Sequence, residues 1–184
     1  MREISLKPSF SSQLQSESAP PPALPSAQRV LGIAGWSGSG KTTLIEKLLP
    51  ELAQLGLSVS VIKHTHHAVQ FEPEGKDTTR FRAAGAGEVL LASPQGFALL
   101  HQGALPLNEL LARLAPVDLV LVEGFKAAAI PKIAVCRAGF PVLDDEHIIA
   151  IASDFSPDSH LPVFDLNQAA AIAAFIAASC HAGF

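Results

Sequence analysis

One eight-residue segment constrains the fold of this chain more strongly than any other. Residues 35–42 read Gly-Trp-Ser-Gly-Ser-Gly-Lys-Thr, which fits the pattern G-x-x-x-x-G-K-[ST]. A short apolar run at 30–34 precedes the segment, and apolar residues at helical spacing follow it over 42–55. The segment therefore predicts a buried strand, a phosphate-binding turn and a helix, which together begin a right-handed βαβ unit.

The residue types in this segment suit the binding of a purine nucleoside triphosphate. Glycines let backbone N–H groups approach phosphate oxygens, and the following helix directs the positive end of its dipole at the same anion. Lys41 is predicted to reach the β- and γ-phosphates, and the Thr42 hydroxyl is predicted to bind Mg²⁺. The predicted phosphate-binding residues are Gly35, Trp36, Ser37, Gly38, Ser39, Gly40, Lys41 and Thr42.

Strand and helix patterns alternate along the rest of the chain. Apolar runs predict strands at 57–62, 118–123, 130–136, 147–152 and 162–164, and a hairpin of strands at 88–92 and 96–101. Helices are predicted at 77–84, 107–114 and 167–180, with Asp77 and Asn167 as N-caps, and Gly56 is expected to end the first helix. This order favours an α/β fold of the P-loop NTPase type, a three-layer sandwich around a mainly parallel sheet with an accessory β-hairpin.

Composition divides the 184 residues into a tail and one domain. Residues 1–28 are rich in Ser, Gln and Pro and are expected to be disordered, whereas 29–184 are expected to form the nucleotide-binding domain. The net charge of −4 argues against a large nucleic-acid interface, and no apolar stretch is long enough for a membrane span. Cys136 and Cys180 are expected to be reduced thiols of a cytoplasmic protein.

A carboxylate is needed to complete the metal site. The strand at 118–123 ends in Glu123, the position of a Walker B acid, whereas Asp118 lies at the opposite end of that strand. Lys41 and Glu123 are therefore the predicted catalytic groups, and Thr42 and Glu123 are the predicted Mg²⁺ ligands. The guanine-reading pattern N-K-x-D is absent; Asp154 follows a strand and is a candidate acceptor for guanine, with a turn-capping role as the equal alternative.

Basic residues gather in the segments that follow the second strand. Lys-His-Thr-His-His at 63–67 comes at the carboxyl end of that strand, the edge at which ligands bind in parallel sheets. This favours contact of the three histidines, the lysine and the threonine with the nucleotide or another phosphate-bearing ligand, with a transition-metal site and a polar turn as alternatives. Lys76 and Arg80 lie one helical turn apart and are candidates to clamp an anion; the alternative is an exposed amphipathic helix.

In combination, these segments resemble the molybdopterin-guanine dinucleotide biosynthesis protein B (MobB) family. The resemblance covers residues 29–165 and rests on the phosphate loop and the segments 63–67, 75–86 and 121–126. It implies a homodimer that binds GTP with Mg²⁺, hydrolyses it weakly, and assists the molybdenum cofactor guanylyltransferase, with molybdopterin as a further candidate ligand. It also implies that Thr43 joins the phosphate loop and that an adjoining site is lined by His64, His66, His67, Lys76 and Arg80.

Two other interpretations remain open at this point. A small-molecule kinase of the uridine kinase type would share the phosphate loop, but no second Arg-rich lid segment follows Glu123. A non-catalytic binding module would use the nucleotide only to set its conformation. The hairpin at 88–101 favours dimerisation, because its strand edges need covering; packing within one subunit is the alternative.

Overall fold

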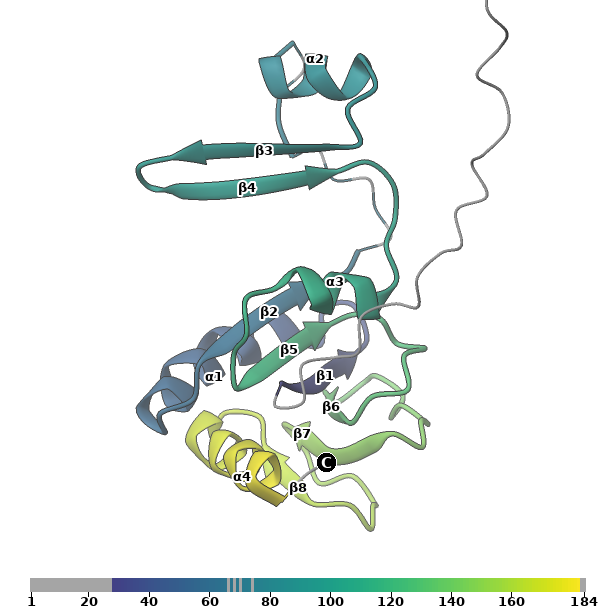
Figure 1. Ribbon diagram of the computed structural model, residues 1–184. Coiled ribbons are helices and arrows are strands. Elements are labelled where there is room, and N and C mark those ends of the chain that lie inside the picture. The colour runs from purple at the N-terminus through teal and green to yellow at the C-terminus, as the bar shows by residue number, and fades with distance from the viewer. Residues whose placement is uncertain (1–27, 66, 68, 70, 74, 183–184) are drawn as a thin grey trace, which may run out of the picture.

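The computed structural model describes residues 28–65, 67, 69, 71–73 and 75–182. The predicted tail, apart from its last residue, and His66 lie outside this described part of the chain. The centre of the molecule is a six-stranded sheet of order β2-β5-β1-β6-β7-β8, in which every neighbouring pair is parallel (Figure 1). The predicted α/β P-loop fold is thereby confirmed.

The elements lie within two residues of their predicted bounds. The sheet consists of β1 (Arg29–Gly35), β2 (Val59–Lys63), β5 (Leu119–Glu123), β6 (Lys132–Cys136), β7 (Ile148–Ser153) and β8 (Val163–Asp165). The helices are α1 (Lys41–Gln54), α2 (Asp77–Ala83), α3 (Leu107–Arg113) and α4 (Ala169–Ala182). The predicted hairpin is formed by β3 (Glu88–Ser93) and β4 (Gly96–His101), which pair antiparallel in a separate sheet.

The main hydrophobic core lies between the sheet and the helices α1 and α4. Leu44, Leu48 and Leu52 repeat every four residues and form one buried stripe of α1. Ile172 and Ile176 do the same on α4, and both stripes pack against buried residues of the central strands. Gly56, with φ 81°, donates its N–H to the Ala53 carbonyl and ends α1 as predicted.

The opposite face of the sheet is covered in two parts. Leu111 of α3 packs on Val120 and Val122 of β5. Over β6 and β7 the cover comes from loops, whose side chains Leu143, Phe155 and Leu161 pack around Ala134 and its buried neighbours. Within the described residues, the second face is therefore covered by α3 over β5 and by the loops that follow β6 and β7 over the other half.

Two predicted helix caps are not formed. Asp77 is the first residue of α2, whose N-cap is Lys76, and its carboxylate lies 3.6 Å from Arg80 instead of on a backbone N–H. Helix α4 begins at Ala169, two residues after Asn167. The carboxylate of Asp165 accepts hydrogen bonds from both the backbone N–H and the side-chain amide of Asn167, which holds that side chain toward β8 and away from the helix.

The hairpin and α2 stand apart from the central sheet, on the side reached from the end of β2 (Figure 1). Several large apolar side chains on them are exposed, among them Phe97 at 75% and Leu90 at 59%. A two-stranded hairpin is only marginally stable alone in water, so burial of these exposed apolar side chains against another surface would stabilise it.

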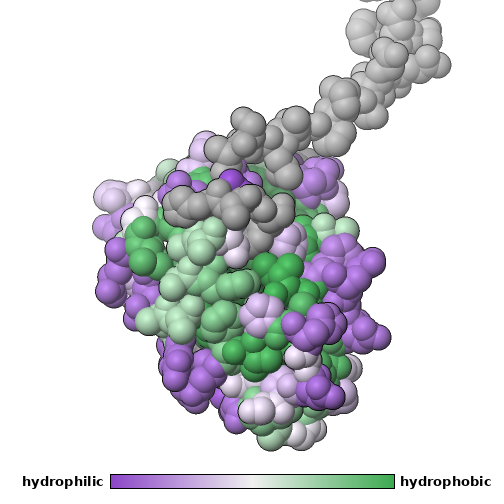
Figure 2. Space-filling model, turned by 90° about the horizontal axis from the view of Figure 1, so that it is seen from below, coloured by the Kyte–Doolittle hydropathy of each residue, from purple (hydrophilic) through white to green (hydrophobic). Residues whose placement is uncertain are grey.

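The face formed by α4 and β8 is viewed in Figure 2 and carries a concentration of hydrophobic side chains. Helix α4 contributes exposed alanines there, at positions 170, 171, 174 and 178. Among the described residues, no helix has both the length and the apolar character needed to cross a membrane.

A buried lysine at the start of β6 forms an ion pair. Lys132 on β6 is only 2% exposed, and its stem passes over Gly32 of β1, where a Cβ would come within 2.8 Å of the lysine Cγ. Its ammonium donates to Asp145 at 2.6 Å, and Asp145 also accepts from the backbone N–H and the ring of His147. These hydrogen bonds, that from Lys132 first, lower the pKa of Asp145 to about 2.

We predict that Asp145→Asn destabilises the fold by about 3 kcal/mol, because it leaves a buried ammonium without its counter-ion. The double variant Lys132→Met/Asp145→Asn should recover most of this loss, and the exposed neighbour Asp144→Asn is the matched control. Because the folded-state pKa of Asp145 is lowered from 3.8, its contribution is present above pH 4 and is lost as the pH falls toward 2. Urea unfolding at pH 7 and at pH 3 measures both effects; equal stability of wild type and Asp145→Asn at pH 7 would contradict them.

Candidate functional site

The phosphate loop joins β1 to α1, as predicted, and its shape depends on glycine. Gly38 and Gly40 have φ of 79° and 96°, a conformation that other residues rarely adopt. A Cβ at Gly35 would lie 2.5 Å from the Ser39 hydroxyl and 2.8 Å from the Val135 carbonyl. Gly40 is the N-cap of α1 and supplies no side-chain hydrogen bond, so the first N–H groups of this helix are left for an anion.

Lys41 spans the mouth of the loop. Its ammonium donates to the Trp36 carbonyl at 2.7 Å. Burial lowers the pKa of Lys41; the Glu123 carboxylate opposes this, and the positive charges of Lys126 and Lys63 add to it. A phosphate arriving in the loop would supply the negative charge that this desolvated ammonium lacks.

Thr42 and Glu123 meet at the base of the cavity. The Thr42 hydroxyl lies 3.1 Å from one oxygen of the Glu123 carboxylate and 3.0 Å from the other. Neighbouring ligands of an octahedral magnesium ion stand about 3 Å apart, because each Mg–O bond is about 2.1 Å long. The spacing and the oxygen chemistry of this pair therefore fit Mg²⁺, bound directly or through water.

Strand register explains why these groups meet. Glu123 ends β5, which lies between β1 and β2 in the sheet, and it is aligned with Ile33 on one side and Lys63 on the other. The ammonium of Lys63 lies 3.1 Å from the Thr42 hydroxyl and 3.4 Å from the Glu123 carboxylate. Asp118, at the far end of β5, instead accepts hydrogen bonds from the backbone and hydroxyl of Ser58, which is consistent with the choice of Glu123 over Asp118.

The turn after β5 closes tightly on the segment after β2. The His64 N–H donates to the Glu123 carbonyl at 2.7 Å, and the His64 ring lies 4.3 Å from the Phe125 ring. Gly124, with φ 101°, has no room for a Cβ, which would come within 2.8 Å of the His64 Cβ. Phe125 also has positive φ, at 47°, so the conformation of this turn is held by the surrounding contacts.

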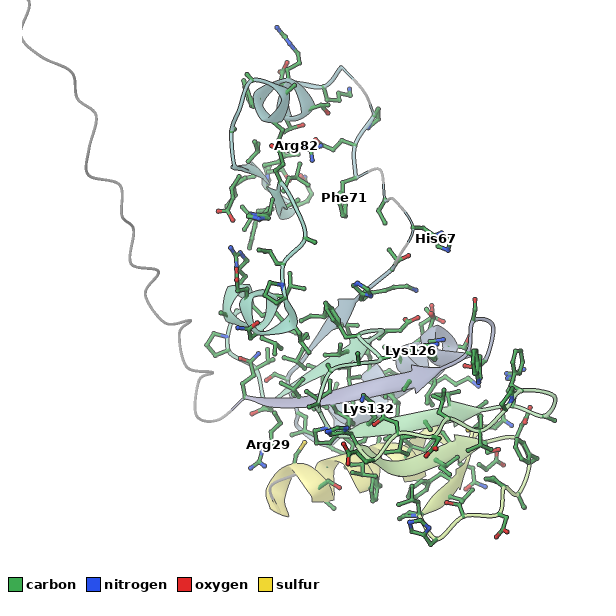
Figure 3. The ribbon with its side chains drawn as sticks, turned by 90° about the vertical axis from the view of Figure 1, so that its right-hand side faces the viewer. Arg29, His67, Phe71, Arg82, Lys126 and Lys132 are labelled. Carbon is green, nitrogen blue, oxygen red and sulfur yellow. The ribbon has the colours of Figure 1, made fainter. Side chains whose placement is uncertain are left out.

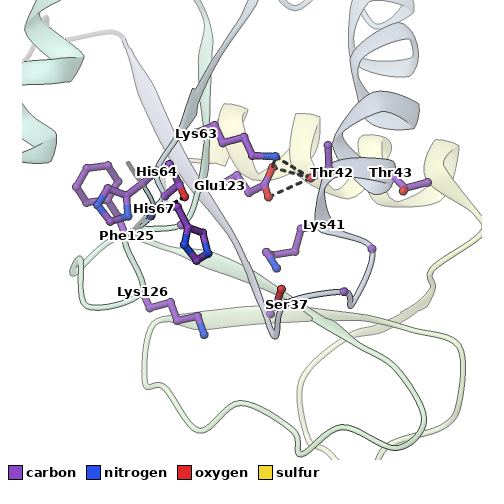
Figure 4. Close-up of a pocket in the computed structure, with 15 residues that line it drawn as sticks. Ser37, Lys41, Thr42, Thr43, Lys63, His64, His67, Glu123, Phe125 and Lys126 are labelled. Atoms are coloured by element: carbon purple, nitrogen blue, oxygen red, sulfur yellow. Dashed lines mark hydrogen bonds and ion pairs between the residues drawn. The ribbon is translucent and has the colours of Figure 1, made fainter. Parts of the chain in front are cut away.

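These groups surround a cavity of about 580 Å³ (Figure 4). Among the described residues, its lining carries three ammonium groups, those of Lys41, Lys63 and Lys126, and one carboxylate, that of Glu123. Of the residues predicted from the sequence, the cavity brings together Gly35, Ser37, Gly38, Gly40, Lys41, Thr42, Thr43, His64, His67 and Glu123. Its electrostatics and its loop suit a polyphosphate with a divalent cation.

The other residues of the loop support it from outside the cavity. Ser39 is fully buried. Trp36 donates its indole N–H to the Pro141 carbonyl at 2.8 Å, and the Lys126 ammonium lies 4.8 Å from the centre of its ring. This cation–π contact and hydrogen bond connect the loop to the segments that follow β5 and β6.

Three predicted site residues lie elsewhere. Lys76 and Arg80 are at α2, beyond the connecting segment that carries His67, and neither lines the cavity (Figures 1 and 3). Asp154 lines a second cavity of about 480 Å³ at the carboxyl ends of β7 and β8, with Asp165 and Asn167. Its carboxylate accepts from the Ala138 N–H at 2.9 Å.

Sequence reasoning missed the site roles of several residues. Lys126 lines the cavity just after the carboxyl end of β5. Lys63, at the end of β2, belongs to the predicted segment 63–67 and also lines the cavity, but its contacts to Thr42 and Glu123 were not predicted. Arg137 comes just after β6, and its guanidinium would lie 3.4 Å from a Cβ at Gly40. The same rule of strand ends, applied to every strand beside the phosphate loop, would have selected Lys126 and Arg137 as well.

Comparisons with known proteins agree with this geometry. The model of the family "Molybdopterin guanine dinucleotide synthesis protein B" matches residues 30–154. The chain is 43% identical over 154 residues to the molybdopterin-guanine dinucleotide biosynthesis adapter protein of Haemophilus influenzae, covering 80% of this chain and 86% of that protein. The corresponding adapter protein of Escherichia coli is 39% identical over 158 residues, with 80% and 90% covered. A crystal structure of Bacillus subtilis MobB matches with a TM-score of 0.65 and 26% identity, covering 81% of this chain and 96% of that one.

We predict that Lys41→Ala weakens binding of a magnesium–nucleoside triphosphate complex by about 30-fold or more, through loss of charge-assisted contacts to phosphate. Folding stability should change little, because the ammonium is desolvated and its pKa is already lowered. Calorimetric titration measures the affinity, and Lys47→Ala, an exposed position on α1, is the control. Affinity equal to that of the wild type would remove Lys41 from the site.

Proposed function

We propose a function on one premise that the comparisons establish: the chain belongs to the molybdopterin guanine dinucleotide synthesis protein B (MobB) family. It is a GTP-binding accessory protein in molybdenum cofactor maturation, and it assists the conversion of Mo-molybdopterin to its guanine dinucleotide form. The observation that carries this proposal is the cavity in which Lys41, Thr42 and Glu123 meet beside the phosphate loop. The kinase interpretation is not favoured by the relatives found.

The second cavity supports guanine as the base. It lies at the same edge of the sheet as the phosphate loop, at the end of β7, two strands from β1. Two strand spacings are about 10 Å, a distance that a ribose and a purine can bridge. Asp154 offers a carboxylate there, and a carboxylate can accept from the N1–H and N2–H groups of guanine, whereas adenine presents an acceptor at its N1 position.

Slow hydrolysis follows from the lining of the phosphate cavity. Lys41 would hold the β- and γ-phosphates, and Thr42 and Glu123 would hold Mg²⁺, which when bound neutralises charge that develops on the phosphates. Among the described residues, the cavity lining contains no glutamine that could orient an attacking water. We therefore propose a weak GTPase that works as an adaptor and depends on a partner for any faster turnover.

We also propose that the hairpin forms a homodimer interface. Leu90 and Leu99 are directly opposite in the β3–β4 register, and with Phe97 they share one exposed apolar face. A second copy could cover this face with two-fold symmetry, since both copies need the same burial. The guanylyltransferase that joins GMP to molybdopterin is the proposed heterologous partner, and molybdopterin is a further candidate ligand.

The proposed location is the cytoplasm, where GTP is available and thiols stay reduced. Cys136 and Cys180 are both free and buried, and burial raises the pKa of each thiol. Neither cysteine is therefore a reactive thiolate, and both suit a reducing compartment.

We predict that the wild-type protein binds GTP more tightly than ATP, and that one substitution changes this preference to XTP. Asp154→Asn should weaken GTP binding by about tenfold or more and should favour XTP, because an amide N–H can donate to the C2 carbonyl of xanthine. Calorimetry with GTP, ATP and XTP in the presence of Mg²⁺ measures the exchange, and Asp158→Asn, an exposed loop position, is the control. Tighter binding of ATP than of GTP by the wild type would contradict the proposed role in cofactor maturation.

We predict that Leu90→Asp converts the dimer to a monomer, because it places a charge at the centre of the buried apolar face. Light scattering coupled to size-exclusion chromatography reports the mass in solution. Leu55→Asp is the matched control, since Leu55 is 51% exposed but lies at the end of α1, away from the hairpin. A wild-type protein that is monomeric at every concentration would rule out this interface.

A further inference from the structure

The Lys63 ammonium contacts both of the groups that are proposed to hold the metal. Its ammonium lies 3.1 Å from the Thr42 hydroxyl oxygen and 3.4 Å from a Glu123 oxygen, and these two groups are the proposed magnesium ligands (Figure 4). The Lys63 side chain is 57% exposed, whereas that of Glu123 is only 11% exposed. A mobile cation from the cavity wall therefore lies on a fixed, mostly buried anion.

The contacts of Thr42 make lysine and metal compete directly. The Thr42 hydroxyl donates its hydrogen to Glu123 and accepts a hydrogen bond from Lys63. A magnesium ion bound to Thr42 needs an oxygen lone pair on the cavity side, where the ammonium now lies. The two cations would also repel each other at this distance, since both would sit within the same few ångströms of Glu123.

We propose that Lys63 is a resident cation of the Thr42–Glu123 pair, which neutralises that pair in the nucleotide-free protein and leaves it when Mg²⁺ enters with the nucleotide. This inference rests on the proposed function, because it takes a magnesium–nucleotide complex as the ligand. Lys63 is thus a positioning residue that sets the affinity of the site for the metal.

The backbone around Lys63 confines the exchange to its side chain. Lys63 is aligned with Glu123 in the β2–β5 ladder, and the next N–H, that of His64, donates to the Glu123 carbonyl at 2.7 Å. In this proposal the backbone pairing fixes the end of β2, and only the exposed Lys63 side chain changes its position. The cavity that it enters also contains Lys41 and the loop N–H groups, so a γ-phosphate bound there would accept the displaced ammonium.

This arrangement distinguishes a triphosphate from a diphosphate. With a γ-phosphate present, the displaced ammonium gains an anion to replace Glu123. With a diphosphate that anion is missing, so Lys63 returns to Glu123 and competes with the metal. We therefore expect the metal to be held more tightly with the triphosphate, and Lys63 to be responsible for a large part of the difference.

The test is a titration of Mn²⁺ into the full-length protein saturated with GDP or with a non-hydrolysable GTP analogue, with free Mn²⁺ measured by electron paramagnetic resonance. Lys63→Met should tighten Mn²⁺ binding to the GDP complex by about fivefold or more. It should tighten binding to the GTP-analogue complex much less, so the difference between the two nucleotides shrinks. Trp36, the only tryptophan, reports nucleotide occupancy and folding of each variant by its fluorescence.

Lys126→Met is the matched control, because Lys126 lines the same cavity but lies over Trp36 and not on the Thr42–Glu123 pair. Unchanged or weaker Mn²⁺ binding by Lys63→Met in the GDP complex overturns the inference, and so does equal tightening by Lys126→Met, which would reflect net charge alone. If wild type binds nucleotide but neither nucleotide complex binds Mn²⁺, the proposed metal site itself fails. That result is distinguishable from a site that binds Mn²⁺ without competition from Lys63.

Discussion

The in-register pairing of β5 between β1 and β2 is the constraint on which the site depends. It aligns Glu123 with Ile33 and with Lys63, so the ends of three strands, distant in sequence, lie at one edge of the sheet. The phosphate loop begins at the same edge, two residues after Ile33. Helix α1 then packs on one face of the sheet, and the Thr42 hydroxyl in its first turn donates to Glu123. A shift of one residue in this ladder would reverse the side on which Glu123 points and would leave Thr42 without a carboxylate. The burial of Leu119, Val120, Leu121 and Val122 on both faces of β5 makes such a shift costly.

The fold separates a site supported by the buried core from a segment whose apolar side chains are exposed. All the groups that meet in the phosphate cavity come from the ends of strands or from the first turn of α1, and their positions follow from the buried core beneath them. The hairpin and α2 lack such a core, and Leu90, Leu99 and Phe97 remain exposed. They are connected to the site through the segment that begins with His64, which contacts the backbone of Glu123 and the ring of Phe125. The phosphate cavity and the proposed contact surface on the hairpin are therefore joined by the connection that begins at His64.

The sequence predicted what depends on the local pattern and missed what depends on the path of loops. Glycine spacing identified the phosphate loop. The apolar run 119–122 selected Glu123 over Asp118, because the residue at the carboxyl end of a parallel strand lies at the edge of the sheet where ligands bind. Lys76 and Arg80 could not be placed in this way. They follow a connection whose direction no periodicity specifies, and the structure puts them at α2, away from the cavity. The segment 63–67 was placed at the strand end, and within it Lys63, the last residue of β2, makes the contacts to Thr42 and Glu123.

The charges in the cavity explain why such a site suits a triphosphate. Within the part of the lining that the structure describes, the ammonium groups of Lys41, Lys63 and Lys126 and the carboxylate of Glu123 give three positive charges and one negative charge, a formal sum of +2. A magnesium–nucleoside triphosphate complex carries about −2, whereas the corresponding diphosphate complex carries about −1. The cavity is therefore neutral with the triphosphate and keeps an uncompensated charge with the diphosphate. Because the site is partly buried, this imbalance is poorly screened and favours the state before hydrolysis. This charge balance favours a triphosphate over a diphosphate, which is consistent with the proposed adaptor that holds GTP and hydrolyses it slowly.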